Sequence, residues 1–201
     1  MSDFPLVISY FTKKTGYQLE VQNLIESCER FQVEHLIEGI ASFGSWELNC
    51  AFKPFFIYQK LQELKRPLFW IDADGLFVQK PRFLAEFEAD LSIRMHEEYP
   101  ADHPSRVITS GIFVNNTPQA EKILKSWALE CQKQLLNPAR KEEFWDQIAL
   151  RDVLQREGHG AKVTPLPLSY AKIFDHPLDG EKVQAPVIEQ YQASRRYKKL
   201  I

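Results

Sequence analysis

The 201-residue sequence predicts an α/β protein whose mostly parallel central sheet is flanked by helices. Short apolar runs rich in β-branched and aromatic residues alternate with longer segments of helical periodicity. The chain has the length of one domain and 44% hydrophobic residues, so we expect a single domain over residues 1–201. One apolar run ends in two aspartates, and ligands of such sheets bind outside the carboxyl ends of the strands.

The first half of the chain has a β-α-β-α-β pattern. Apolar runs predict strands over residues 5–11, 33–40 and 67–74. Apolar residues at helical spacing predict helices over 19–31 and 51–64, with Pro54 tolerated in a first turn. A loop is expected around Gly44 and Trp46. This alternation is typical of parallel strands connected by helices.

The second half continues the alternation less regularly. A short helix is expected around Phe83, Leu84 and Phe87, and a polar loop over 97–106. Strands are predicted over the ranges 89–96, 107–114, 163–170 (an edge strand that contains two prolines) and 186–192. Helices are predicted from Thr117 to Asn137 and over 142–157, the second closed by Gly158.

Composition excludes several classes of protein. The net charge of −2 argues against a nucleic-acid partner, because such a protein needs a strongly basic face. Cys28, Cys50 and Cys131 have no C-x-x-C spacing, which favours reduced core thiols over disulfides or a zinc site. The N-terminus has no basic leader and only a short apolar run, so we expect no transmembrane segment and a cytoplasmic location.

Asp72 and Asp74 form a D-x-D pair where the predicted strand 67–74 ends. Side chains two positions apart on a strand point to the same side, so the two carboxylates should converge. Hard oxygen ligands of this kind suit Mg²⁺ or Mn²⁺ carrying a diphosphate. A solvated acidic turn after a strand is the structural alternative.

Several short motifs keep one order along the chain. They are Ser9-Tyr-Phe-Thr12, Lys53-Pro-Phe-Phe-Ile57, Pro67-Leu-Phe-Trp-Ile-Asp-Ala-Asp74, Ser110-Gly-Ile-Phe-Val-Asn-Asn116, Trp145-Asp-Gln147 and Gln192-Ala-Ser-Arg195. Together they resemble the nucleotide-diphospho-sugar transferases of the GT-A fold, and most closely the glycogenin and galactosyltransferase group. The resemblance spans nearly the whole chain, although no single motif is specific.

This resemblance implies a Rossmann-like GT-A fold and a metal-dependent hexosyltransferase. The implied donor is a nucleotide diphosphate sugar, with a UDP-sugar favoured, and the implied cofactor is Mn²⁺ or Mg²⁺. Asp74 would be the main metal ligand, and Asp72 would contact the metal or the ribose. Transfer would retain the anomeric configuration, and the acceptor (glycan, lipid or protein) is not identified.

The resemblance also implies roles for other residues, each with a structural alternative. Lys53 would face the diphosphate or sugar, or be a solvated lysine at a helix start. Tyr10 and Thr12 would hold the nucleoside, with Tyr10 stacking on uracil, or be packed at a strand end. Asn115 and Asn116 would bond sugar hydroxyls, or form a turn.

Asp146 and Gln147 would lie near the anomeric carbon and stabilise an oxocarbenium-like transition state, by the logic of glycoside cleavage. The alternative for Asp146 is a favourable interaction with the helix dipole.

One feature departs from the family pattern. Relatives supply a third metal ligand as a histidine from the last strand, and here residues 187–194 contain none. Glu189 or Gln190 could supply an oxygen instead. The five histidines are scattered without metal-ligand spacing. The basic terminal residues could lean toward the diphosphate or toward acidic lipid, with a solvated tail as the default; they are Arg195, Arg196, Lys198 and Lys199.

Other functions stay open at this point. The missing histidine suggests a non-catalytic or weakly active nucleotide-sugar binding protein. A nucleotidyltransferase is less favoured, because the segment after the first strand holds only Gly16 and lacks a glycine-rich phosphate loop. The last alternative is an interaction domain with an acidic turn.

Overall fold

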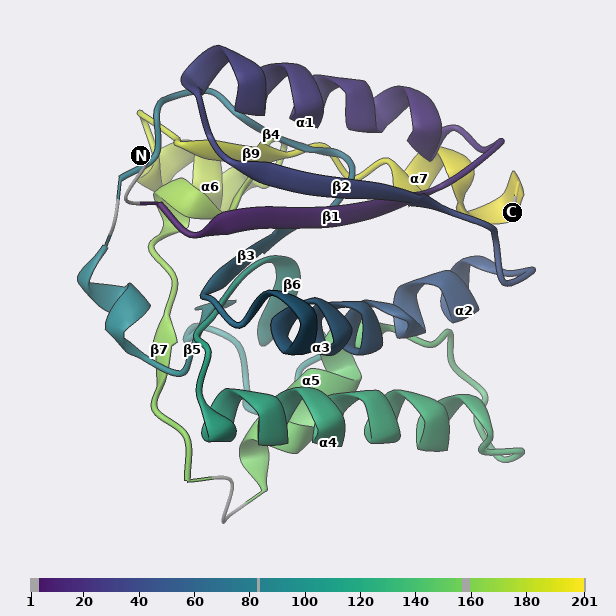
Figure 1. Cartoon of the computed structure of the whole chain (residues 1–201). Helices are drawn as coiled ribbons and strands as arrows, with labels where there is room; N and C mark the ends of the chain where they lie inside the picture. The colour runs from purple at the N-terminus through teal and green to yellow at the C-terminus, as the bar shows by residue number, and fades with distance from the viewer. Residues whose placement is uncertain (1–3, 83, 157–159, 201) are drawn as a thin grey trace.

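A six-stranded sheet with helices on both faces forms the centre of the protein (Figure 1). The computed structural model describes residues 4–82, 84–156 and 160–200. The strands lie in the order β2-β1-β3-β6-β5-β7, with bounds β1 Leu6–Thr12, β2 His35–Ile40, β3 Leu68–Ile71, β5 Leu91–Met95, β6 Val107–Val114 and β7 Val163–Pro165. Only β6 runs against the others, since it pairs antiparallel with both β3 and β5. The predicted α/β class with a mostly parallel sheet is therefore confirmed.

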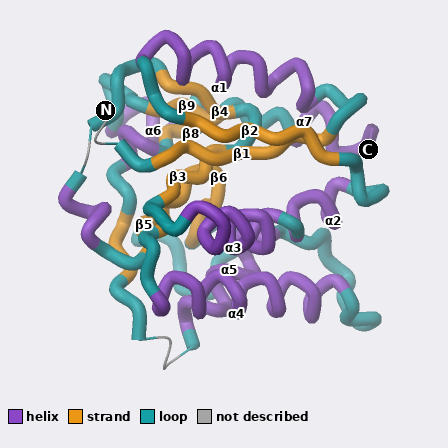
Figure 2. Tube along the Cα trace, in the orientation of Figure 1, coloured by secondary structure: helices purple, strands orange, loops and turns teal. Residues whose placement is uncertain are grey.

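The helices lie in layers above and below this sheet (Figure 2). The helix α1 (Tyr17–Phe31) covers one face; α3 (Lys53–Leu64), α4 (Pro118–Leu135) and α5 (Asp146–Gln155) cover the other. The period of two along β3 divides its side chains between the layers: Leu68 and Trp70 pack on the α3 side, and Phe69 and Ile71 on the α1 side. Burial on both faces explains why this strand is a continuous apolar run.

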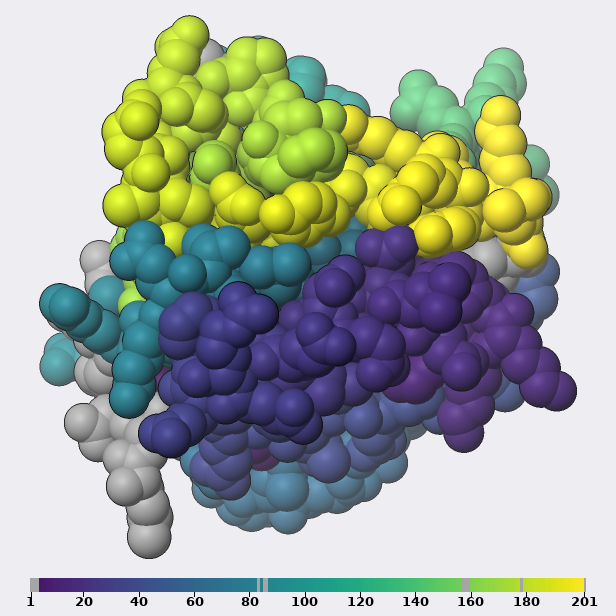
Figure 3. All heavy atoms as spheres, turned by 90° about the horizontal axis from the view of Figure 1, so that it is seen from above, coloured from purple at the N-terminus to yellow at the C-terminus, as the bar shows by residue number. Residues whose placement is uncertain are grey.

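A second sheet, in the order β4-β9-β8, packs beside α1. Its strands β4 (Gly75–Phe77), β8 (Lys172–Ile173) and β9 (Ile188–Gln190) are very short, as are α6 (Pro177–Lys182) and α7 (Ser194–Tyr197). The C-terminal segment lies against the start of α1 (Figure 3), where Arg196 and Tyr197 both bond the carboxylate of Glu20 at 2.9 and 3.0 Å. The C-terminal segment is therefore joined to the first turn of α1.

Some predicted elements differ from the structure. The helix expected over 51–64 is two helices, α2 (Trp46–Ala51) and α3, because the Ser45 hydroxyl accepts from Leu48 N at 3.2 Å and starts a helix in the expected loop. The helix expected from residue 142 begins at Asp146. The short helix near residue 83 is the 3₁₀ turn Ala85–Glu88. Phe83, Glu157 and Gly158, named in these predictions, lie outside the described residues.

Within the part of the chain that the structure describes, none of the helices has the length and apolar character needed to cross a bilayer. This agrees with the expectation of no transmembrane segment.

Gly75 provides a test of the packing beneath the two aspartates. A Cβ atom at Gly75 would lie 2.6 Å from Ile71 Cγ2 and 2.7 Å from Gln190 Oε1, both well inside van der Waals contact. We expect Gly75→Ala to lower the free energy of unfolding by about 1–3 kcal/mol through overpacking. Urea denaturation measures this change.

Gly180→Ala is the matched control, because a Cβ atom added at this position of α6 would have no other atom within 4 Å. It should be neutral or stabilising by up to about 1 kcal/mol. Equal effects of the two substitutions would contradict the packing described around Gly75.

Candidate functional site

A cavity of about 400 Å³ opens where β1, β3 and β5 end and β6 begins. Because β6 is reversed, its first residues lie beside the last residues of its neighbours. The first residues of α3 and α5, Lys53 and Asp146, line the cavity together with Asp72 and Asp74. The carboxyl edge of the sheet thus gathers groups that are up to 93 positions apart, the separation of Lys53 and Asp146 in the numbered sequence.

Lys53 lies at the floor of this cavity with its side chain 6% exposed. Its ammonium nitrogen is 2.9 Å from Asp72 Oδ1, 3.0 Å from Asp146 Oδ2 and 3.3 Å from the hydroxyl and carbonyl oxygens of Thr109. Burial alone lowers the pKa of an ammonium, but the carboxylates of Asp146 and Asp72 outweigh it and raise the pKa of Lys53. The residue stays charged, and protein oxygens take its three donors.

Asp72 and Asp74 follow β3 in a tight turn, with Gly75 N donating to Asp72 O at 2.8 Å. Asp72 Oδ1 also accepts from Trp70 Nε1 at 2.7 Å, which leaves Oδ2 without a hydrogen bond to described residues. Asp74 Oδ2 accepts from Ala193 N at 2.5 Å, so the turn is tied to the C-terminal segment. Both carboxylates border the same cavity, as the D-x-D spacing predicts.

Three carboxylates face one ammonium at this place, an excess of two negative charges when all are ionised. Burial and the neighbouring Asp72 raise the pKa of Asp74 to about 6. Burial also raises the pKa of Asp72, while the Lys53 ammonium opposes that rise. The cavity therefore favours an additional positive charge near Asp74.

Asp146 and Gln147 begin α5 and both face the cavity. Asp146 Oδ2 is held by Lys53 and by the Thr109 hydroxyl at 2.9 Å, and its backbone carbonyl accepts from Trp127 Nε1 at 2.8 Å. Gln147 Nε2 donates to Pro104 O at 2.9 Å, so its amide orientation is fixed from the loop. Both side chains are held rigidly beside Asp72.

Tyr10 and Thr12 also line the cavity, but with little freedom. The ring of Tyr10 packs against Phe52, Phe56 and Trp70, and its hydroxyl donates to Asn49 O at 2.6 Å. Burial is the main cause that raises the pKa of Tyr10 well above its usual value. Tyr10 is part of the wall, and its side chain is buried.

The structure does not bring the predicted asparagines to the cavity. Asn115 and Asn116 follow the carboxyl end of β6, and since β6 is reversed they lie at the opposite edge of the sheet. Asn115 N and Nδ2 bond the carbonyl oxygens of Asp90 and Ala89 there. A structural turn is the interpretation that this placement supports.

Glu189 and Gln190 are likewise not among the residues that line the cavity. Glu189 pairs with Lys172 at 2.8 Å and accepts from the Tyr191 hydroxyl. Gln190 is fully buried behind the turn, with Nε2 donating to Ser110 O at 3.0 Å. Neither side chain lies together with Asp72 and Asp74 at the opening.

Sequence reasoning missed other residues of the site. Trp46 and Tyr17 line the cavity, joined by a 3.3 Å hydrogen bond from Trp46 Nε1 to the Tyr17 hydroxyl. Arg195 and Lys198, expected to be solvated, line it too, while paired with Asp175 and Glu143. His96 and His176 also line it. Arg195 ends the motif Gln192-Ala-Ser-Arg195, but the positions of the two aromatic residues and the two histidines carry no shared motif, so only the tertiary fold reveals them.

The carboxylates of Asp72 and Asp74 fit a hard divalent cation whose other ligands are water and phosphate oxygens. Among the described residues, no group of three or more His, Cys, Asp or Glu side chains could hold a metal ion. Asp72 and Asp74 supply only two carboxylates, but Mg²⁺ commonly uses one or two carboxylates and completes its shell with water and phosphate. The excess negative charge at these carboxylates is consistent with such a cation.

The fold is similar to that of solved glycosyltransferases. One match is a glycosyltransferase involved in the glycosylation of the major capsid of PBCV-1, with a TM-score of 0.67, 14% identity and 96% of each chain covered. Another is the glycosyltransferase GlyE of Streptococcus pneumoniae TIGR4, with a TM-score of 0.53 and 14% identity. That match covers 93% of this chain and 54% of GlyE, so the present chain spans about half the GlyE length.

At this level of identity the likeness shows a glycosyltransferase-like fold. No family model matches the sequence, and no curated protein matches it. The finer resemblance to the glycogenin and galactosyltransferase group stays a prediction.

The raised pKa of Asp74 predicts a pH-dependent change in stability. A carboxyl whose pKa is about 6 in the folded state and 3.8 when solvated destabilises the folded protein progressively as the pH rises through this interval. Asp74→Asn removes the charge and can still accept from Ala193 N. We expect it to raise the free energy of unfolding by on the order of 2 kcal/mol at pH 7.5 in chelator, and the gain should disappear toward pH 4.

Urea unfolding at a series of pH values measures this gain, with the exposed residue Glu29 changed to Gln as a charge-matched control on α1. If the gain in stability is independent of pH, or if Glu29→Gln produces the same gain, the raised pKa of Asp74 is contradicted.

Proposed function

We propose that the protein is a metal-dependent hexosyltransferase that uses a nucleotide diphosphate sugar, with a UDP-sugar favoured, and retains the anomeric configuration. The observation that carries the proposal is the excess of negative charge at Asp72 and Asp74, next to the fixed Asp146, in a cavity of a glycosyltransferase-like fold. A diphosphate bound with a divalent cation fits that charge distribution.

The order of the elements along the cavity suggests how the donor would lie. Tyr17 and Trp46 border the end of β1 and offer aromatic surface for the base. Asp72 and Asp74 follow β3, the next strand of the sheet, and suit the diphosphate with its cation. Asp146 lies on the far side of Lys53, beside the start of β6, where the sugar would follow.

When the nucleoside diphosphate departs, the negative charge that develops on it must be stabilised. Mn²⁺ or Mg²⁺ held by Asp72 and Asp74 would supply positive charge against the leaving diphosphate. Arg195 and Lys198 add cationic donors from the C-terminal segment, on the same cavity. Their ion pairs with Asp175 and Glu143 are exposed, so exchange for a phosphate partner costs little.

In the transfer, the acceptor hydroxyl oxygen forms the bond to the anomeric carbon as the bond from that carbon to the diphosphate breaks. The bonding electrons leave with the diphosphate, which also takes up the hydroxyl proton. Asp146 Oδ2 is held by Lys53, whereas Oδ1 has no hydrogen bond to described residues and can face the positive charge that develops on the sugar. Gln147 is placed to orient the reacting groups.

One observation favours a second candidate, a nucleotide-sugar binding protein with weak or no turnover. The described residues offer no third side-chain ligand beside Asp72 and Asp74. An incompletely held cation would bind the donor yet stabilise the leaving group poorly.

Asp74→Asn tests the proposal directly. Titration calorimetry with UDP-glucose and UDP-galactose should show binding that Mn²⁺ strengthens, and release of UDP should follow. In Asp74→Asn the Mn²⁺-dependent gain in affinity should fall by about tenfold or more, because one of two anionic ligands is lost. Glu29→Gln should keep the full metal effect.

The result separates the candidates. Metal-dependent binding with UDP release supports the transferase, and the same binding without release supports the binding protein. Unchanged metal dependence in Asp74→Asn would remove the metal-site assignment.

A further inference from the structure

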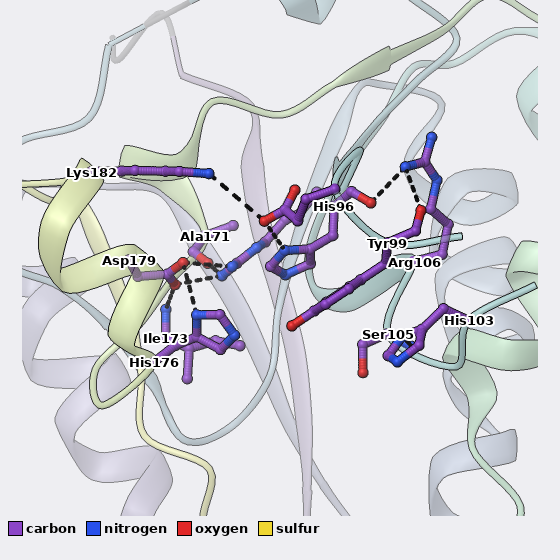
Figure 4. A network of polar contacts seen from close by, with 12 residues as sticks. His96, Tyr99, His103, Ser105, Arg106, Ala171, Ile173, His176, Asp179 and Lys182 are labelled. Atoms are coloured by element: carbon purple, nitrogen blue, oxygen red, sulfur yellow. Dashed lines mark hydrogen bonds and ion pairs between the residues drawn. The ribbon is translucent and has the colours of Figure 1, made fainter. Parts of the chain in front are cut away.

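The cavity has a second region, next to β5, whose lining includes no Asp, Glu, Lys or Arg side chain. Its lining residues are His96, Tyr99, Ser105, Ile108, Ile173 and His176 (Figure 4). In the sheet, β5 lies beyond β6 as seen from β3, so this region adjoins the place proposed for the donor sugar. We refer to these six residues as the neutral wall.

Two imidazoles, those of His96 and His176, lie close together in the neutral wall. His96 is 3% exposed, and its ring centre lies 5.5 Å from that of His176. His96 Nδ1 is 3.1 Å from Glu98, and Nε2 has no hydrogen bond to described residues. His176 Nδ1 is buried without a hydrogen bond and lies 3.5 Å from Asp179 Oδ1. His96 therefore lines the cavity with one ring nitrogen, Nε2, that makes no hydrogen bond to described residues, whereas the buried His176 Nδ1 faces Asp179.

The His96 imidazole is suited to uncharged partners. Burial, together with the nearby Arg94 and His176, lowers the pKa of His96 despite the opposing Glu98. A neutral imidazole offers one donor and one acceptor, the same combination that a sugar hydroxyl needs.

A buried ion pair fixes the position of the neutral wall. Arg94 on β5 donates to both carboxylate oxygens of Asp179 at 2.6 and 2.7 Å, and to Ala171 O at 2.6 Å. Asp179 also accepts from Ile173 N at 2.7 Å. Arg94 and Asp179 bind each other, so the segment that carries His176 is held against β5.

Tyr99 is a half-exposed aromatic residue in the loop after β5. Its ring stacks on His103 with the ring centres 4.3 Å apart, and lies 5.2 Å from His96. Arg106 holds the loop by donating to the carbonyl oxygens of His96 and Tyr99. Figure 4 shows the Tyr99 ring extending toward the two imidazoles, and its hydroxyl makes no hydrogen bond with described residues.

We infer that the neutral wall is the acceptor subsite and that the acceptor is an uncharged sugar of a glycan. His96 Nε2 and the Tyr99 hydroxyl match sugar hydroxyls, and the half-exposed edge of the Tyr99 ring adds apolar contact for a pyranose. A phosphorylated acceptor would meet no free cation on this wall, and an acyl chain would leave its polar groups unpaired. This inference rests on the proposed function, since it requires the donor sugar to lie beside Asp146.

Saturation-transfer NMR on protein loaded with UDP and Mn²⁺ tests the inference. The probes are the methyl glycosides of glucose, galactose and N-acetylglucosamine, with glucose 6-phosphate as the anionic comparison. At least one neutral glycoside should bind, more tightly than glucose 6-phosphate. Tyr99→Ala should weaken it by about tenfold, and Tyr99→Phe should weaken it less because the ring is kept. Phe55→Ala, on the far side of α3, is the control for loss of an exposed aromatic ring.

The outcomes separate this inference from the proposal on which it rests. Absence of UDP binding contradicts both. UDP binding with no bound neutral glycoside, with equal affinity in Tyr99→Ala and the control, or with tighter binding of glucose 6-phosphate overturns the acceptor assignment alone. Retained UDP binding by Tyr99→Ala shows that this variant is folded.

Discussion

The ammonium of Lys53, buried between Asp72 and Asp146, is the interaction on which the cavity depends. It joins the turn after β3 to the first residues of α3 and α5. Removing one member of a buried ion pair typically costs about 3–5 kcal/mol, because the other charge is left uncompensated. Lys53 carries one positive charge against three carboxylates. The site therefore favours a further positive charge beside Asp74.

Most of the fold follows from local sequence patterns. Continuous apolar runs identify strands that are covered on both faces, as in β3 and β6, and helical spacing identifies α1 and α4. The direction of β6 cannot be predicted from the sequence, because a buried parallel strand and a buried antiparallel strand have the same continuous apolar pattern. Because β6 is reversed, Asn115 and Asn116 lie at the sheet edge opposite the cavity, whereas Thr109 lies at the cavity. Strands of two or three residues, such as β4 and β8, are too short for any pattern.

The candidate site divides in the same way. Asp72, Asp74 and Asp146 were predictable because each stands where an element ends or begins, and the fold places such points along one edge. Pairs formed by tertiary contact were not predictable, since His96 follows β5 whereas His176 precedes α6, and the two are far apart in the sequence. The last strand lacks the expected histidine, yet the cavity contains two, which lie at its uncharged end.

A crystal structure of the protein grown with UDP and Mn²⁺, with the anomalous signal of manganese, tests the central claim most directly. The proposed donor site predicts one manganese peak bonded to carboxylate oxygens of Asp72 and Asp74 at about 2.0–2.2 Å, with the diphosphate attached and the base beside Tyr17 and Trp46. Lys53 should remain between Asp72 and Asp146. Nucleotide bound outside this cavity, or manganese bound to other side chains, would contradict the account.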